Sequence, residues 1–274
     1  MNALVIVLAG VAAVAVVMTA AAITAKRQGR VAIVDAAWGA AFVLLAVVLV
    51  GVSALLREDS DASPRSSWLP WLVAALVVVW GVRLTAHLVV RVLGSDHDDP
   101  RYEEMLGGKA TEVPFVQIVL KVFALQGVIV LLVAAPLYVV ALADVSWSWW
   151  VPVGVVVWLV GVLMESAADR QLKAYRADPD RPPLLRTGVW SWSRHPNYFG
   201  DACVWWGIWL AGGTASTWWL ALITSLGPIA MTWFLTAVSG VRLAERRMAG
   251  RPGWDEYAAR TSVFVPLPPR RLGP

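Results

Sequence analysis

The stretch AIVDAAWGAAFVLLAVVLVGVSALL, residues 32–56, carries a single charged side chain, Asp35, in 25 residues. A membrane-spanning helix needs about 20 mainly apolar residues, so this stretch is long enough to cross a bilayer. The whole chain is similar: 58% of its 274 residues are hydrophobic, 15% are charged and the mean hydropathy is +0.64. Soluble domains carry about 25% charged residues. The composition therefore predicts an integral membrane protein.

Seven stretches have the length and hydropathy of a spanning helix, at about 2–25, 32–56, 68–93, 114–143, 147–170, 198–214 and 216–240. Lys and Arg are densest in the segments 26–30, 91–109, 170–194 and 242–271. Basic connecting segments face the cytoplasm, so the alternation places the N-terminus outside and the C-terminus in the cytoplasm. We predict an all-α polytopic membrane protein with seven transmembrane helices in one domain covering residues 1–274.

The segment 241–262 differs from these spans because it mixes arginines and carboxylates with Met248, Trp254 and Tyr257. It is too polar to cross a bilayer, and we expect a cytoplasmic helical extension at the membrane surface or over the mouth of the bundle. The net charge of +4 comes from basic residues between apolar spans. It therefore does not indicate binding to nucleic acid.

Two other features indicate no chemistry of their own. Residues 95–99, SDHDD, are consecutive and do not converge easily on one ion, so we predict no metal site there. The lone cysteine, Cys203, lies in an apolar run, where cysteine usually acts as a small buried hydrophobe.

Several polar residues occur where a membrane helix would normally exclude them. Asp35 lies near the start of the second span, and Arg83, His87 and Arg91 follow one another at spacings of four in the third. That spacing puts the three on one helix face. Charged groups inside a membrane usually face the protein interior and mark a site. Asp35 could act as a proton donor, since burial favours its neutral form, or could pair with an arginine.

A second polar group surrounds the end of the fifth span and the start of the sixth. Glu165 and Asp169 are four residues apart and are followed by Arg176, and the segment 193–201, SRHPNYFGD, precedes an apolar run. Carboxylates accept hydrogen bonds from ribose hydroxyls, and arginine forks match phosphate oxygens. This combination is typical of a nucleotide site.

These motifs resemble a known family. Residues 188–201 (GVWSWSRHPNYFGD), 240–248 (GVRLAERRM), 254–257 (WDEY) and 260–266 (RTSVFVP) are similar to the signature of bacterial membrane proteins of the steroid 5-alpha-reductase family, the DUF1295 group. The resemblance implies seven transmembrane helices in the bacterial inner membrane. It also implies an oxidoreductase acting on a CH–CH group, like 3-oxo-5-alpha-steroid 4-dehydrogenase, that uses NADPH to reduce a double bond conjugated to a carbonyl. Its partners would be membrane lipid and a lipid-soluble substrate such as a sterol, an isoprenoid or an unsaturated lipid.

The resemblance also implies roles for individual residues. Asn197 and Asp201 match a cofactor-binding asparagine and acid, and Glu165 takes the place of an asparagine. Arg246 falls at the position of a cofactor-contacting histidine. The residues expected to contact NADPH are Glu165, Asp169, Arg176, Arg194, His195, Asn197, Tyr198, Asp201, Arg242, Glu245 and Arg246.

The expected catalytic residues are Asp35 and His87. Asp35 falls near a membrane glutamate that contacts the substrate carbonyl in the steroid enzymes. Those enzymes pair it with a tyrosine on the third span, but residues 86–89 here are AHLV, so His87 is expected to supply the hydrogen-bond donor.

An alternative family shares part of this pattern. The motif Arg194-His195-Pro196-x-Tyr198-x-Gly200 also resembles membrane methyltransferases of the isoprenylcysteine carboxyl methyltransferase type, which use S-adenosylmethionine. Asn197, the RTSVF sequence at 260–264 and the seven predicted spans favour the reductase group, since the methyltransferases have about five spans.

Overall fold

The computed structural model of the chain describes residues 2–58, 68–94, 98–238 and 240–271. These residues form helices joined by short connections, and none of them belongs to a β-strand. One isolated parallel bridge pairs Ser193 with Ser262. The prediction of an all-α fold is confirmed.

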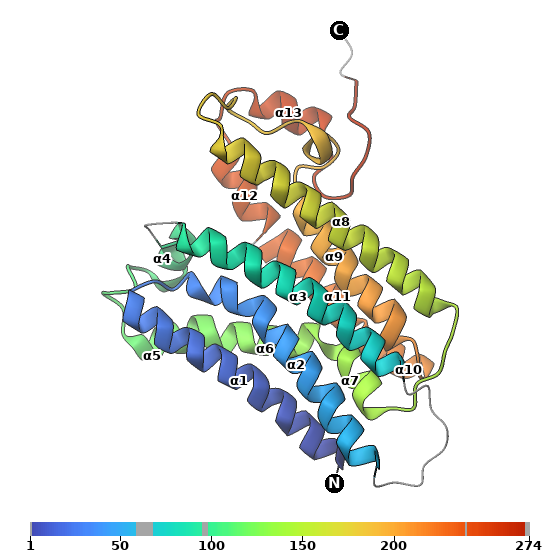
Figure 1. Ribbon diagram of the computed structural model, residues 1–274. Helices are drawn as coiled ribbons and strands as arrows, with labels where there is room; N and C mark the ends of the chain where they lie inside the picture. Colours follow the sequence, from blue (N-terminus) through green and yellow to red (C-terminus); the bar gives the residue numbers. More distant parts are fainter. Residues whose placement is uncertain (1, 59–67, 95–97, 239, 272–274) are drawn as a thin grey trace. The chain divides into compact units, whose positions relative to one another are not determined.

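The chain divides into two compact units (Figure 1). Unit 1 comprises Met1–Ser148 and Gly212–Leu226, and unit 2 comprises Trp149–Ala211 and Gly227–Pro274. Each unit contains both long apolar helices and a polar end.

Unit 1 is built around three long helices. It contains α1 (Asn2–Gln28), α2 (Ile33–Glu58), α3 (Leu69–Leu93), α4 (Pro100–Leu106), α5 (Phe115–Ile118), η1 (Val119–Ala124), α6 (Leu125–Val133), α7 (Ala135–Leu142) and α10 (Trp218–Thr224). The helix α2 lies between α1 and α3 and packs against both (Figure 1). Glycine allows the closest of these approaches, because a Cβ on Gly81 would lie 2.9 Å from the carbonyl oxygen of Gly39.

The predicted span at 114–143 is not one continuous α-helix. It consists of α5, the π-helical η1, α6 and α7, and the last break falls at Ala134. Pro136 lies two residues later, in the first turn of α7, and proline lacks the N–H that would continue the preceding helix. The chain therefore starts a new helix there.

Unit 2 is built on two long neighbouring helices. It contains α8 (Trp150–Ala177), η2 (Gly188–Ser191), α9 (Pro196–Ile208), most of α11 (Leu226–Trp233), η4 (Phe234–Val238), α12 (Val241–Met248) and α13 (Trp254–Arg260), while η3 (Trp209–Gly213) crosses the boundary between the units. Of all helix pairs among the described residues, α8 and α9 form the most extensive contact.

Six helical segments among the described residues are long and apolar enough to cross a membrane: Asn2–Gln28, Ile33–Leu56, Leu69–Leu93, Phe115–Val133, Trp150–Ala177 and Trp218–Met248. The predicted span at 198–214 corresponds to α9 and η3 and is not among them. This run is shorter, and Asn197 and Asp201 make its beginning polar.

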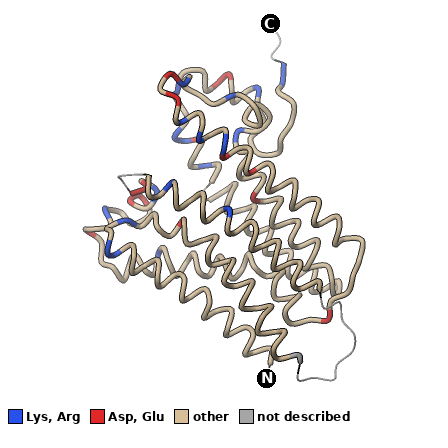
Figure 2. The backbone as a smooth tube through the Cα atoms, in the orientation of Figure 1, with Lys and Arg blue, Asp and Glu red and all other residues tan. Residues whose placement is uncertain are grey.

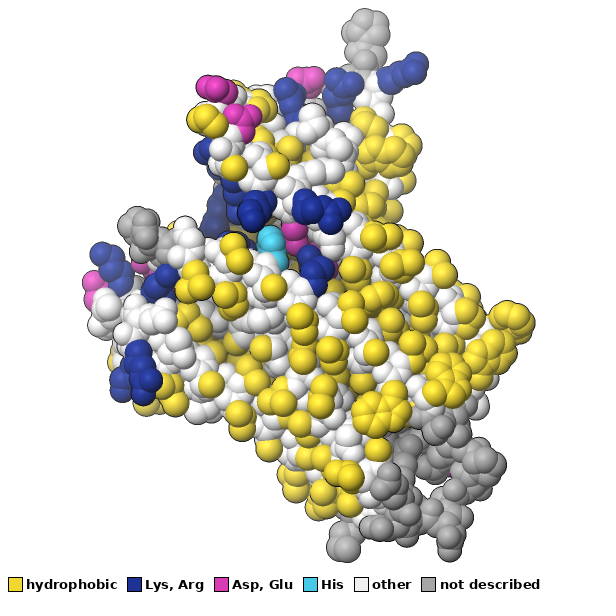
Figure 3. All heavy atoms as spheres, viewed as in Figure 1, with side chains coloured by type: hydrophobic (Ala, Val, Ile, Leu, Met, Phe, Trp, Pro, Cys, Tyr) yellow, Lys and Arg dark blue, Asp and Glu magenta, His cyan; other side chains and the backbone are white. Residues whose placement is uncertain are grey.

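Charged residues gather at one end of each unit. In unit 1 most Lys and Arg lie toward the end that carries α4, and in unit 2 they lie around α12 and α13 (Figure 2). Hydrophobic side chains cover most of the visible surface of the long helices (Figure 3). This distribution suits helices that cross a bilayer with one polar end in water.

Candidate functional site

Unit 2 contains a pocket of about 380 Å³. Its lining is Leu172, Tyr175, Arg176, Arg181, Leu185, Trp190, Arg194, His195, Asn197, Tyr198, Ala244, Met248, Arg251, Trp254 and Tyr257. These described residues include four arginines and five tyrosine or tryptophan rings, and none of them is Asp or Glu. The pocket therefore combines positive charge with flat apolar surfaces.

The segment before α9 forms one wall of this pocket and is fixed by hydrogen bonds to the C-terminal part of the chain. The backbone N–H of Arg194 donates to the carbonyl of Ser262 at 2.8 Å. The hydroxyl of Ser193 donates to the carbonyl of Phe264 at 2.8 Å and accepts from the backbone N–H of His195 at 3.0 Å. Pro196 then begins α9, where a missing N–H costs nothing.

Arg194 joins three parts of the chain. Its Nε and Nη2 donate to the two carboxylate oxygens of Glu245, at 2.7 and 3.2 Å, and its Nη1 donates to the carbonyl of Ala258 at 2.6 Å. Its guanidinium also lies over the ring of Trp254, 5.6 Å from the centroid. The Arg194 side chain is 8% exposed. It thus pairs with α12 and α13 at the same time.

His195 shares the same carboxylate. Its Nε2 lies 3.2 Å from Oε1 of Glu245, and its ring stacks on that of Tyr198, with centroids 5.5 Å apart. Burial lowers the pKa of His195 below its ordinary value, and the nearby charge of Arg194 lowers it further, while the bond to Glu245 opposes both. The result is a neutral imidazole at neutral pH.

Two of the five rings that line the pocket, Trp254 and Tyr257, come from α13. The hydroxyl of Tyr257 donates to the carbonyl of Trp190 at 2.6 Å. Leu184, Trp254 and Tyr257 form a buried cluster, against which Met248 packs. These contacts hold the C-terminal segment on the same pocket that the 193–198 segment lines.

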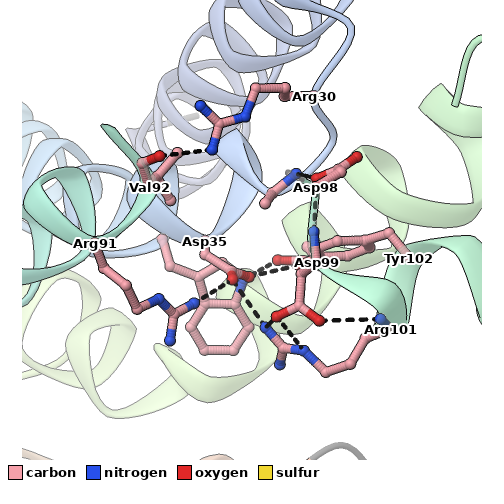
Figure 4. Close-up of polar contacts among 11 residues, drawn as sticks. Arg30, Asp35, Arg91, Val92, Asp98, Asp99, Arg101 and Tyr102 are labelled. Carbon is pink, nitrogen blue, oxygen red and sulfur yellow. Dashed lines mark hydrogen bonds and ion pairs between the residues drawn. The ribbon is translucent and has the colours of Figure 1, made fainter. Parts of the chain in front are cut away.

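A second polar group lies in unit 1, around Asp35 (Figure 4). Oδ2 of Asp35 accepts hydrogen bonds from Arg91 at 2.6 Å and Arg101 at 2.9 Å, and Oδ1 accepts from the hydroxyl of Tyr102 at 2.5 Å. Tyr102 in turn accepts from Gln126 at 3.3 Å. Asp35 therefore pairs with arginines, one of the two roles considered from the sequence.

The short helix α4 supplies most of this network. Asp99 caps α4 by accepting from the backbone N–H of Arg101 at 3.0 Å, and it also binds the Arg101 side chain. Burial alone would lower the pKa of Arg101, but the carboxylates of Asp35 and Asp99 raise it overall. Burial, together with the charge of Asp35, raises the pKa of Tyr102 well above its ordinary value. The tyrosine therefore keeps its proton.

Asp98 ties the same helix to the start of α2. Its carboxylate accepts from the backbone N–H groups of Val31 at 2.7 Å and Ala32 at 2.8 Å (Figure 4). Of the sequence 95–99, residues 95–97 lie outside the described part of the chain. In the part that is described, no three His, Cys, Asp or Glu side chains are grouped to hold a metal ion.

Comparison with known proteins identifies the family. The sequence model of a family described as "Protein of unknown function (DUF1295)" matches residues 21–261. The chain belongs to the DUF1295 family. A search of curated proteins and a search of solved structures found no match. The part of this DUF1295 protein that matches contains every pocket residue and the Asp35 network.

The structure of the DUF1295 protein brings together only some of the residues predicted to contact a cofactor. Those that line the pocket are Arg176, Arg194, His195, Asn197 and Tyr198. Glu245 lies behind them, bound to two of the five. Glu165, Asp169, Asp201, Arg242 and Arg246 are not among the lining residues.

Four of these other residues lie either in the interior of unit 2 or on its surface. Glu165 and Asp169 are buried on α8. A Cβ on Gly200 would lie 2.8 Å from that of Glu165, so Glu165 belongs to the close contact between α8 and α9. Arg242 and Arg246 are exposed on α12.

The predicted catalytic residues of the DUF1295 protein belong to unit 1, whereas the pocket belongs to unit 2. His87 is partly buried on α3, one turn before Arg91, which binds Asp35. Their catalytic roles stay predictions. The sequence did not single out Arg101 and Tyr102, or Arg181 and Arg251 in the pocket. The available signal for the first pair was the run DDPRY at 98–102, which sets Arg101 and Tyr102 beside two carboxylates.

Proposed function

We propose that this chain is an NADPH-dependent membrane reductase that acts on the carbon–carbon double bond of an apolar enone, as a part of lipid metabolism. The observation that carries the proposal is the charge of the pocket in unit 2, where four arginines and no described Asp or Glu line the wall. Arginine forks match phosphate oxygens, and aromatic rings offer flat surfaces to a base. The pocket volume, about 380 Å³, lies within the range of small-molecule sites, about 300–1,000 Å³.

The same charge distinguishes the two cofactors that the motif leaves open. NADPH carries several phosphate charges, whereas S-adenosylmethionine has no phosphate and carries a cationic sulfonium. A wall with Arg176, Arg181 and Arg251 and no carboxylate attracts the first and repels the second. The pocket also lies at the start of α9, where Asn197 and Tyr198 are in the first turn and backbone N–H groups favour an anion.

NADPH, when bound, supplies the hydride for the reduction. Within the pocket the arginines would hold its phosphates, and the rings of Trp190 and Trp254 would pack against a base. Of our two candidates at the substrate carbonyl, His87 would donate to the oxygen, while Asp35, which accepts hydrogen bonds from Arg91 and Arg101, would hold these cations in place. The hydroxyl of Tyr102, which keeps its proton and binds Asp35, orients this carboxylate.

We further propose that α9 and η3 form a seventh span and that the C-terminus faces the cytoplasm. The basic residues of α12 and α13 support this orientation, since positive charge favours the cytoplasmic side. The protein would then lie in a bacterial inner membrane with its N-terminus outside. Cysteine labelling of single-cysteine variants in intact cells tests the orientation.

Thermal stability of the purified protein tests the cofactor. A ligand present at about 100 times its dissociation constant stabilises a protein by about 2.7 kcal/mol, which corresponds to a rise of about 5–10 °C in Tm. We expect that rise with NADPH and none with S-adenosylmethionine. Arg251→Gln should reduce it, while Arg170→Gln, at an exposed position on α8 outside the pocket, should not.

The alternative function is an S-adenosylmethionine-dependent methyltransferase. It is favoured by one observation, that Arg194, His195 and Tyr198 of the shared motif all line the pocket. Stabilisation by S-adenosylmethionine alone would establish this alternative and refute the reductase proposal.

A further inference from the structure

We infer that Arg194 and Glu245 form a positioning pair that fastens α12 and α13 to the segment before α9, and that the exposed Arg176, Arg181 and Arg251 are the cations that hold the ligand's phosphates. The inference changes the role expected of Arg194 from cofactor contact to support of the pocket wall. It rests on the proposed function for the identity of the ligand, but not for the pair itself.

The hydrogen bonds of Arg194 support the first part of the inference, that Arg194 and Glu245 form a positioning pair. A guanidinium has five N–H groups, and three of them donate here, two to Glu245 and one to the carbonyl of Ala258. The bond to Glu245 uses both carboxylate oxygens, the arrangement in which arginine is held most firmly. With its side chain 8% exposed and Trp254 beneath it, Arg194 is buried and fixed before any ligand arrives.

The location of these partners explains why the pair supports the pocket. Glu245 lies on α12 and Ala258 on α13, while Arg194 itself precedes α9. The helices α12 and α13 and the connection between them contribute Met248, Arg251 and Trp254 to the pocket lining. If the pair is broken, the wall that contains these residues loses its charged link to the 193–198 segment and keeps the hydrogen bonds made by the backbone of Arg194 and by Ser193 further along the chain.

The charges and exposure of the other arginines support the second part of the inference, that they hold the ligand's phosphates. Glu245 neutralises Arg194, so Arg194 adds little net positive charge to the pocket, and Arg176, Arg181 and Arg251 are the other guanidinium groups of its lining. Arg176, Arg181 and Arg251 are all exposed, where a polyanion can reach them. Nη1 of Arg181 donates to the carbonyls of Arg176 and Asp178, at 3.2 and 3.3 Å, which places this guanidinium at the end of α8 beside Arg176.

Substitution of Glu245 by glutamine distinguishes a positioning role of Arg194 from direct contact with phosphate, because the two roles predict opposite changes in ligand affinity. If Arg194 bound phosphate directly, Glu245→Gln would release its charge and strengthen the binding of NADPH or inorganic pyrophosphate. If the pair supports the wall, the same variant weakens both by about tenfold. Arg194→Lys keeps the charge but loses the fork, and we expect a similar weakening. Tighter binding in Glu245→Gln would overturn the inference.

The phosphate-holding arginines are tested by a matched pair of variants. Arg251→Gln should weaken pyrophosphate binding by about tenfold and leave the Tm of the ligand-free protein within about 1 °C of the wild type. Arg170→Gln should change neither. Equal pyrophosphate affinity in the two variants would overturn this part.

Ligand-free stability tests the pair without reference to any cofactor. Arg194→Gln and Glu245→Gln should each lower Tm by about 3–6 °C, and the double variant should lose clearly less than the sum, because removal of the second partner no longer leaves an unpaired charge. If the fall in Tm of the double variant equalled the sum of the two single falls, the inference that Arg194 and Glu245 form a pair would be wrong. Wild-type protein that binds pyrophosphate but not NADPH would refute the proposed reductase alone, whereas protein that binds neither would overturn the role of the three exposed arginines as well.

Discussion

Gly161 on α8 and Gly200 on α9 allow the backbones of the two helices to touch, and an alanine at either position tests this packing. A Cβ on Gly200 would lie 2.6 Å from the amide nitrogen of Glu165 and 2.7 Å from the carbonyl oxygen of Gly161. A Cβ on Gly161 would lie 2.6 Å from the carbonyl oxygen of Gly200. These neighbours are backbone atoms, so no side chain can rotate to make room.

The loss of stability caused by Gly200→Ala can be estimated from how far α8 and α9 would have to move apart. Carbon contacts are most favourable at about 3.5–4.0 Å, so a methyl group at 2.6 Å requires α8 and α9 to move apart by roughly 1 Å. A gap of this size forfeits about a quarter to a half of the affected dispersion energy, and overpacking costs about 1–3 kcal/mol. Because the neighbours here are backbone atoms that cannot rotate away, we take the upper end of that range, about 3 kcal/mol, from which the gain in helix propensity from glycine to alanine returns about 1 kcal/mol. We expect Gly200→Ala to destabilise the protein by about 2 kcal/mol.

Thermal unfolding of purified protein in detergent measures this cost. A loss of about 2 kcal/mol corresponds to a fall of about 4–8 °C in Tm for a protein of this size. Gly51→Ala is the matched control, because a Cβ on Gly51, also within a helix, would meet no atom within 4 Å. The double variant Gly161→Ala/Gly200→Ala should lose less than the sum, since one separation accommodates both methyl groups. If Gly200→Ala melted at the same temperature as Gly51→Ala, the explanation of the motif glycine by helix packing would be wrong.

Four further substitutions test the polar contacts. Asp35→Asn should destabilise the protein by about 2 kcal/mol, because it removes the charge that two arginines share. Tyr102→Phe, which loses one hydrogen bond to Asp35, should cost about 1 kcal/mol. If both variants had the Tm of the wild type, the Asp35 network would not contribute to stability as we argue. Burial lowers the pKa of His195, so the unfolded chain takes up that proton first as the pH falls below about 6.5, and stability must decline there. The fall in Tm from about pH 7.5 to about pH 5 should be smaller in His195→Gln, and an unchanged fall would contradict the assignment. Ser193→Ala should cost about 2 kcal/mol, because it leaves the carbonyl of Phe264 and the N–H of His195 without their partner, and Tm measures that loss against the wild type.

The sequence predicted the helices better than their interruptions. Apolar length alone located the long helices α1, α2, α3 and α8, because a bilayer-spanning run is a strong and local signal. The same criterion predicted one continuous span at 114–143 and overlooked the break at Ala134. Pro136 was the available signal, since proline ends an α-helix whatever the hydropathy around it.

The candidate site could be predicted only where its residues are close in sequence. The segment 193–198 was recognised as a unit, and four of its residues line the pocket. Glu165 and Asp169, four residues apart, were assigned to the same site because a pair of carboxylates followed by arginines suits ribose hydroxyls and phosphates, and because of the family resemblance. That spacing does not say what the face contacts, and here Glu165 belongs to the contact with α9.

The contacts that Arg194 makes with distant residues could not be predicted from the motif. Arg194 and Glu245 are 51 residues apart, and nothing in the spacing of one arginine among many selects its partner. Gly200 of the same motif has a packing role that any tightly paired helices could require. If Arg194 and Gly200 serve the scaffold, as we propose, neither of them selects the ligand. The proposed function then assigns that choice to residues outside the motif, among them the exposed Arg181 and Arg251, whose charge favours a phosphorylated cofactor.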